Sequence, residues 1–382
     1  RGLAHHRAIH KTRIMVFSEG EMATWRERGW IILEAVVPPE QCALLVDAIF
    51  RQLRQDPDDP ATWYPREYPQ PHGRSDHHDG FLAFDPTPEF AATRALQWQI
   101  CQNERIYRAH AQLLGEHRLR MGMQVGRAYM KPPYIGGDTL GVEMSGPLEL
   151  PDEKIFHRRG GDIKLPGGEM ALHFDTSLDD IRRGEISGTN LLQGNISLTD
   201  TPGDAGGTCL LPGFHHEILE WVQRFPPLDP EADTWATDGS KGGWPGRNAN
   251  TAWPHAFDAE GVPLPLPQLD RLREERIAAG RVKPDWVGNL NHPELAPFQH
   301  RIRSIPTKCG DLLIWHRGCP HGNGYNLTKQ PRMAQFVDFS VLGEGQPTEE
   351  EIAASTKAWE EVGAPPMSDL NRKVAGLEPW GD

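Results

Sequence analysis

Apolar and polar residues in the first part of the chain follow a helix, a strand and a second helix. Ser18 stands three residues before Glu21, which is the spacing of a capping box, and Gly29 suits a C-cap, so a short helix is predicted between them. The apolar run WIILEAVV at 30–37 predicts a strand. The segment 38–55 has proline near its start and apolar residues at helical spacing, which predicts an amphipathic helix.

The pattern changes beyond Met121 to short apolar runs that are separated by Gly, Pro and Asp turns. Before that point, 56–79 is a loop rich in proline, histidine and aspartate, and 88–115 predicts a helix in two pieces. The predicted strands lie within 121–133, 169–177, 189–200, 206–216, 310–318 and 332–342. Many short strands of this kind favour a β-sandwich or closed barrel over a parallel sheet with crossover helices. The predicted class is therefore mainly β with flanking α-helices.

One long interval, 217–303, interrupts the series of strands. It is rich in Pro, Gly, Asn and Trp and contains one predicted helix at 267–280. Two interpretations are equally open: a functional lid or binding loop, or a packing excursion that covers one face of the barrel. The predicted organisation is an N-terminal arm at 1–17, one domain at 18–345 that contains this insertion, and a C-terminal extension at 346–382.

Composition narrows the class of protein and its surroundings. The 382 residues include no apolar run near the ~18 to 20 residues that a membrane span needs, so a membrane is not an expected partner. The net charge of −13 makes nucleic acid an unexpected partner, because proteins that hold phosphate backbones are usually basic. Five cysteines without CxxC spacing indicate neither a disulfide framework nor a cysteine zinc site, and they fit a cytoplasmic protein.

The N-terminal residues are basic and contain three histidines, His5, His6 and His10. They lack the apolar stretch of a secretory signal, so no such signal is expected. Metal binding by these histidines is not expected either. Met15 is a plausible alternative start.

The candidate chemistry begins with a histidine and an aspartate on one predicted strand. His173 and Asp175 are two residues apart, so they share one face of the strand. This pair alone occurs by chance in many proteins, and a third ligand is needed. His321 lies far downstream, with Arg332 on the next predicted strand. Two imidazoles and a carboxylate suit Fe(II) and leave positions open, and a guanidinium suits a carboxylate ligand.

Other histidines compete for these roles. His316 precedes His321 by an odd offset and is expected to face the other way on a strand, while His215 and His216 follow a PG turn and are expected to be structural. The loop pair His77 and His78, beside Asp76 and Asp79, is expected to be solvated. Gly206 and Gly207 are expected in a tight turn, and Lys131 and Gln124 on an early strand are expected outside the pocket.

At this point the sequence resembles the phytanoyl-CoA dioxygenase-like branch of the Fe(II)/2-oxoglutarate oxygenases. Four ordered motifs carry the resemblance, and together they span Met22 to Leu342. The motifs are the opening MATWRERGWIILEAVVPPEQCALL at 22–45, LHFDTS at 172–177, DAGGTCLLPGFHH at 204–216, and GDLLIWHRGCPHGNGYN at 310–326 followed by Arg332. The ordered set is much more specific than any one motif.

The resemblance implies a double-stranded β-helix, a jelly-roll or cupin-like core with N-terminal helices. It implies Fe(II) bound by His173, Asp175 and His321, with 2-oxoglutarate and O₂ as cosubstrates and Arg332 on the distal carboxylate. Asn323 stands where the family often has a serine beside the ligand histidine, and Asn195 falls where relatives place a cosubstrate-contacting side chain. Relatives that halogenate replace the aspartate by a small residue, so Asp175 favours hydroxylation or another oxidation of a small organic substrate over halogenation, with succinate as coproduct. Desaturation, epoxidation and ring rearrangement use the same iron site and stay open beside hydroxylation.

Two alternatives stay open at this point. The first is a non-oxidative cupin-like isomerase or small-molecule-binding protein, whose metal set is usually richer in histidine and needs no arginine after the last ligand. The second is a catalytically silent relative, against which the intact ligand set counts. An acyl-CoA substrate is not favoured, because no basic cluster suits its phosphates.

Overall fold

The structure of the protein is a computed structural model. It describes residues 15–64, 81–82, 91–121, 127–134, 170–174, 181, 191–223, 256–264, 278, 298, 300–342, 347–361, 363 and 366–381, with the backbone alone at 81–82, 170, 171 and 173. The predicted helix at 267–280 falls outside these residues except for Ala278, as do His5, His6, His10, the histidine pair at 77–78 and Gln124. In the described part, no helix has the length and apolar content of a membrane span.

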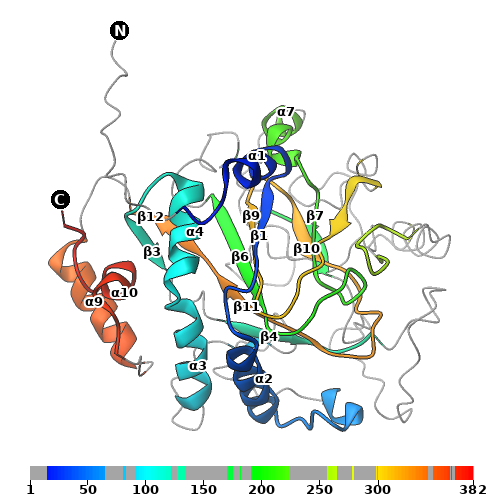
Figure 1. Cartoon of the computed structure of the whole chain (residues 1–382), viewed down its shortest axis with the longest axis horizontal. Coiled ribbons are helices and arrows are strands. Elements are labelled where there is room, and N and C mark those ends of the chain that lie inside the picture. The colour runs from blue at the N-terminus through cyan, green and yellow to red at the C-terminus, as the bar shows by residue number, and fades with distance from the viewer. Residues whose placement is uncertain are drawn as a thin grey trace.

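Two antiparallel sheets form the centre of the molecule (Figure 1). The larger has the strand order β1-β9-β6-β11-β4-β2, the smaller β5-β10-β7-β8, and a separate pair joins β12 to β3. The strands are β1 Trp30–Leu33, β2 Phe81–Leu82, β3 Leu119–Met121, β4 Ala128–Lys131, β5 Met170–His173, β6 Leu192–Ser197, β7 Thr208–Leu210, β8 Arg303–Ser304, β9 Leu312–His316, β10 His321–Asn323, β11 Arg332–Val337 and β12 Phe339–Val341. This is the mainly β, jelly-roll architecture that the sequence predicts, as an open sandwich in place of a closed barrel.

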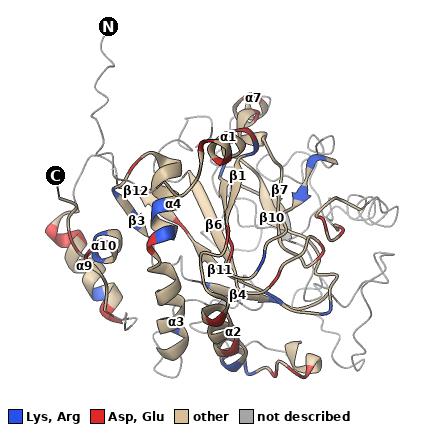
Figure 2. Ribbon diagram, in the orientation of Figure 1, with Lys and Arg blue, Asp and Glu red and all other residues tan. Residues whose placement is uncertain are grey.

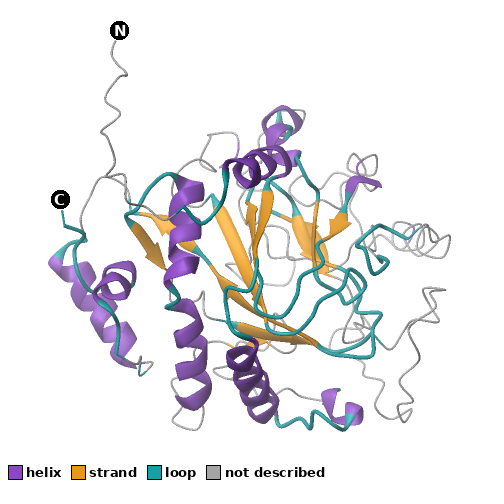
Figure 3. Ribbon diagram, in the orientation of Figure 1, coloured by secondary structure: helices purple, strands orange, loops and turns teal. Residues whose placement is uncertain are grey.

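Helices cover the outer face of the larger sheet (Figure 3). The helical segments are α1 Glu19–Arg28, α2 Pro39–Leu53, η1 Pro60–Trp63, α3 Ala91–Cys101, α4 Glu104–Leu114, η5 Phe214–His216, α7 Ile218–Val222, α9 Glu349–Glu361 and α10 Asp369–Val374. Charged side chains are concentrated on these helices and on the loops, whereas the central strands carry few (Figure 2). The predicted capping box of α1 is present, because Ser18 and Glu21 bond each other's backbone, and Gly29 ends the helix with φ +75°.

Strand register divides the larger sheet into two faces. Ile31, Ile314, Ile196 and Met333 belong to the core shared with the helices. Leu313 and Trp315 alternate with them and pack instead against Leu210 and Ile305, which belong to or adjoin the smaller sheet. Residues that pair across neighbouring strands lie on the same face. The inward face of the larger sheet therefore includes Gln193, Asn195, Ser197, Tyr129, Lys131, Arg332 and Phe336.

The C-terminal residues pack onto the helical layer. Trp359 of α9 lies 4.1 Å from Trp98 of α3 between ring centroids, and its indole nitrogen donates to the Ala375 carbonyl. Trp380 stacks on Tyr107 of α4 at 6.0 Å. The extension therefore contributes to the core of the molecule.

Strand β1 is shorter than predicted. The backbone turns at Ala35, which has φ +46° and donates its N–H to Asp311 at 2.9 Å. Val36 and Val37 then donate to the Gly310 carbonyl, outside the regular sheet. The apolar run continues to Val37 because these valines are buried under the turn. Apolar periodicity alone cannot distinguish this from a longer strand.

Candidate metal centre

The smaller sheet brings together two of the predicted ligand positions. Antiparallel β5 and β10 are neighbours, and their register pairs the backbone of His321 directly with that of His173. Partners in such a register have Cα atoms about 4.5–5.5 Å apart. Asp175 and the side chain of His173 lie outside the described residues. Among the residues described, no three His, Cys, Asp or Glu side chains converge on one point.

His321 lies at the beginning of β10 and is only 6% exposed. Its ring packs against Trp315 of the larger sheet, with centroids 5.3 Å apart and planes inclined by 46°. The Trp315 indole in turn donates to Gln193 at 3.2 Å. The opposite neighbour of β10 is β7, where Leu210 pairs with His321. These contacts restrict the orientation of the imidazole inside the sandwich.

Arg332 is a buried cation at the start of β11, with 2% of its surface exposed. Its described contacts are neutral: the Gly206 carbonyl at 3.5 Å, the Thr208 hydroxyl at 3.4 Å and the face of Tyr129 at 5.5 Å. Within the described part of the chain its Nε has no hydrogen-bond partner. Burial lowers the pKa of this guanidinium from its ordinary value. A buried cation held only by neutral groups is a suitable site for an anionic ligand.

The hydroxyl of Thr208, which the sequence did not indicate as a site residue, connects Arg332 to the opposite sheet. Thr208 of β7 accepts from Asn195 of β6 at 2.8 Å and also from Arg332. Both lone pairs of the hydroxyl are then used, so its hydrogen is available to donate. Asn323 is buried on β10 and pairs in register with Thr208. Asn195 and Asn323 therefore both adjoin Thr208, and Thr208 is the residue that contacts Arg332.

Lys131 is a second buried cation next to Arg332. The two residues pair across β4 and β11, and Lys131 is 3% exposed. Its ammonium donates to the Gly324 carbonyl at 2.5 Å. A Cβ on Gly206 would lie 3.0 Å from the Lys131 side chain, and Gly206 has φ +71°, so glycine is required at this turn. The expectation that Lys131 lies outside the pocket is wrong, since it faces inward beside Arg332.

The competing histidines contact a different set of residues from His321. His316 ends β9 and pairs with Leu192, which belongs to the helix-facing core, so it faces away from the space between the sheets, as predicted. His215 and His216 lie in the 3-10 turn after β7, and both ring Nε2 atoms contact the Arg26 carbonyl. These contacts agree with the structural role that is expected for His215 and His216.

Two facing antiparallel sheets with a buried guanidinium and paired histidine positions define a jelly-roll protein with a candidate metal centre. The family model of phytanoyl-CoA dioxygenase (PhyH) matches residues 162–334, which include His173, Asp175, His321 and Arg332. This segment of the chain is therefore similar to the phytanoyl-CoA dioxygenase family, as the four motifs indicated. The match agrees with the class of enzyme that the resemblance implies, the Fe(II)- and 2-oxoglutarate-dependent oxygenases.

Several solved structures are similar to this chain at low identity. EvdO2 from Micromonospora carbonacea var. aurantiaca is 18% identical, with a TM-score of 0.44 and coverage of 85% of this chain and 91% of that one. EctD from S. alaskensis is 14% identical, with a TM-score of 0.43 and coverage of 87% and 80%. The carbocyclase SnoK from nogalamycin biosynthesis is 17% identical, with a TM-score of 0.40 and coverage of 85% and 84%. A search of curated proteins gave no match.

Proposed function

We propose that the protein hydroxylates a small organic substrate and converts 2-oxoglutarate to succinate and CO₂. In this proposal His173, Asp175 and His321 hold Fe(II), and Arg332 holds the distal carboxylate of 2-oxoglutarate. The observation that carries it is the register that pairs His321 with His173, together with the buried Arg332 of the facing sheet, whose described hydrogen-bond acceptors are neutral. The bound iron, with 2-oxoglutarate and O₂, supplies the oxidising power for insertion of oxygen into a C–H bond.

The residues around Arg332 suit a dicarboxylate. The guanidinium can form two parallel bonds to one carboxylate, and the free hydrogen of the Thr208 hydroxyl can donate to the same group. Asn195 orients that hydroxyl from the opposite sheet. Lys131 adds a second positive charge on the neighbouring strand. Together these groups would compensate the negative charge of a buried 2-oxoglutarate.

The side chains between the sheets also limit access of water. Trp315 and Phe336 lie on the inward face of the larger sheet, and Trp315 packs on the His321 ring. An apolar wall strengthens electrostatic contacts to the cosubstrate, because the local dielectric constant is low. The aspartate at position 175, where the halogenating relatives have a small residue, supports hydroxylation over halogenation.

The test is succinate formation measured with a panel of candidate substrates. His321→Ala and Asp175→Ala are expected to abolish substrate-dependent succinate release. Full turnover by Asp175→Ala would refute the ligand assignment. Turnover that needs the metal but neither O₂ nor 2-oxoglutarate would support a cupin-like isomerase instead.

The assignment of Arg332 has its own variant. Arg332→Gln is expected to weaken 2-oxoglutarate binding roughly 10- to 100-fold, because charged hydrogen bonds contribute about 1.5–3 kcal/mol. The matched control is Arg108→Gln, since Arg108 is exposed and pairs with Glu104 on the surface of α4. Unchanged 2-oxoglutarate affinity in Arg332→Gln would exclude Arg332 as the anchor.

A further inference from the structure

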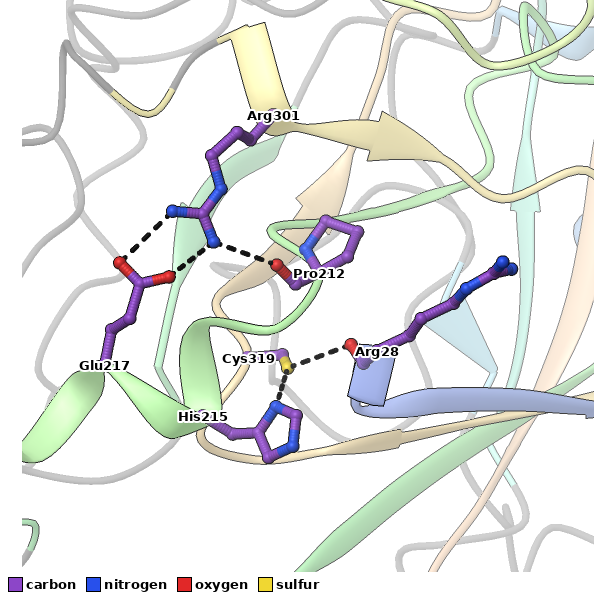
Figure 4. Close-up of polar contacts among 6 residues, drawn as sticks. All are labelled: Arg28, Pro212, His215, Glu217, Arg301 and Cys319. Carbon is purple, nitrogen blue, oxygen red and sulfur yellow. Dashed lines mark hydrogen bonds and ion pairs between the residues drawn. The ribbon is translucent and has the colours of Figure 1, made fainter. Parts of the chain in front are cut away.

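Three distant segments meet beside the start of β10 (Figure 4). They are the end of α1 at 26–29, the turn after β7 at 212–217, and the connection from β9 to β10 at 316–320. We call them the His215 junction, because the His215 ring contacts residues of the other two segments. None of these residues is among the proposed ligands of iron or 2-oxoglutarate.

Hydrogen bonds fix the tautomer of His215. Its Nε2 and that of His216 lie 3.0 Å and 2.8 Å from the Arg26 carbonyl oxygen. A carbonyl only accepts, so both Nε2 atoms carry hydrogen. Burial lowers the pKa of His215 from its ordinary value, so the ring is neutral near pH 7. The Nδ1 of His215 is therefore an acceptor.

The acceptor faces a buried thiol. The Sγ atom of Cys319 lies 3.5 Å from His215 Nδ1, and Cys319 has no exposed surface. The thiol hydrogen can donate to Nδ1 in this geometry, and the Arg28 carbonyl, 3.9 Å from the sulfur, is a second and more distant acceptor (Figure 4). The backbone of Gly29 covers the contact closely: a Cβ there would lie 2.5 Å from the sulfur and 2.6 Å from Nδ1, and φ is +75°. The contact is thus enclosed on the α1 side by a residue that has to be glycine.

The thiol is two residues from the proposed metal ligand. Cys319 and Pro320 form the turn that leads into His321, and proline restricts the backbone between them. Two backbone bonds also hold this turn: Cys319 N–H to the His316 carbonyl at 2.8 Å, and Leu211 N–H to the Pro320 carbonyl at 3.1 Å. The Cys319 side chain is the contact that ties the turn to His215.

The other end of the junction is anchored by an ion pair. Arg301 bonds both carboxylate oxygens of Glu217, at 2.5 Å and 3.1 Å, and also donates to the Pro212 carbonyl at 3.3 Å. These bonds bracket the turn that carries His215. The backbone that carries the His215 imidazole is therefore fixed at Pro212 and at Glu217, on either side of the turn.

We propose that His215 is a positioning residue for the metal ligand His321 and acts through the Cys319 thiol. The inference rests on the proposed function, since it assumes that His321 binds the metal. Metal sites are sensitive to the partners that orient their ligands, and loss of such a partner typically weakens binding 10- to 100-fold. Because His215 contacts Cys319 and not the ligand itself, we expect its loss to weaken metal binding by about tenfold, the lower end of that range.

The test is titration with Co(II), an iron surrogate, monitored by its visible absorption in four variants. His215→Asn places an amide oxygen near the position of Nδ1 and keeps the acceptor for Cys319, whereas His215→Gln keeps a donor for Arg26 and removes that acceptor. His216→Ala is the matched control, because it also loses one bond to Arg26 but has no contact with Cys319. Cys319→Ala removes the donor and leaves His215 in place.

The expected result is about tenfold weaker Co(II) binding in His215→Gln and Cys319→Ala, and affinity close to wild type in His215→Asn and His216→Ala. Thermal unfolding of the four variants measures their stability separately. If His215 had a merely structural role, Co(II) affinity would decrease in proportion to the unfolding temperature across the variants. Wild-type affinity in both His215→Gln and Cys319→Ala overturns the inference alone. Failure of the wild-type protein to bind Co(II) overturns the proposed function as well.

Discussion

At the scale of single residues, the site depends on buried polar groups whose charge state the fold sets. Arg332 and Lys131 are buried cations on paired positions of neighbouring strands. His110 is buried and His316 is half-buried, and desolvation holds both imidazoles neutral, with pKa values lowered to about 4 and about 3. In the proposed function, the negative charge of 2-oxoglutarate compensates the two cations. The two neutral imidazoles instead affect the free energy of unfolding as the pH changes.

The buried imidazole of His110 predicts loss of stability in acid. Its folded pKa, about 4, is below the ordinary 6.5, so the unfolded chain takes up a proton first as the pH falls. The contribution is complete above pH 6.5 and is lost between there and about pH 4. In this range the free energy of unfolding should fall by up to about 1.4 kcal/mol per pH unit for this one group.

Denaturant unfolding at a series of pH values measures this. His110→Leu should flatten the dependence, and His300→Leu, which changes an exposed histidine, should leave it intact. An equal slope in His110→Leu and the wild-type protein would contradict the prediction.

The hydroxyl of Thr208 predicts a defect in cosubstrate affinity. Thr208→Val keeps the shape of the side chain and removes the group that contacts Asn195 and Arg332. We expect 2-oxoglutarate to bind about tenfold more weakly, because one hydrogen bond to a charged group is lost. Isothermal titration calorimetry measures the change, and Thr356→Val on α9 is the control. No change relative to that control would remove Thr208 from the site.

At the scale of elements, local signals in the sequence identify most helices and strands. These signals do not predict the contacts between side chains of different strands. The capping box at Ser18 involves residues three apart and is readable from the chain alone. The role of Thr208 depends on contact between β6, β7 and β11, and no spacing within one segment encodes it. The end of β1 was also missed, because Ala35 takes a left-handed conformation that is rare for alanine.

The C-terminal helix α9 predicts a stability effect without an effect on the site. Trp359 is buried against Trp98 and bonds the Ala375 carbonyl. Trp359→Ala should lower the free energy of unfolding by about 3–5 kcal/mol, as expected for a large aromatic removed from a core. Lys357→Ala, at an exposed position of the same helix, is the control. Equal stability of the two variants in urea would show that α9 is dispensable.

At the scale of the whole molecule, the sandwich of two sheets determines which distant residues can meet. The jelly-roll class follows from many short strands with turn residues between them, and that part was predictable. The pairing of His321 with His173 joins positions far apart in the sequence, and the resemblance to a family predicted it where periodicity could not. The inward position of Lys131 was not predicted, because it follows from the register of β4 on β11.

The central claim is that the space between the sheets binds Fe(II) and 2-oxoglutarate together. Anaerobic titration of the wild-type protein with both, monitored by the weak visible charge-transfer band of the ternary complex, tests it most directly. The band should appear and saturate in the wild-type protein, be absent in His321→Ala, and need far more 2-oxoglutarate in Arg332→Gln. Absence of the band in the wild-type protein, or its persistence in His321→Ala, would contradict the claim.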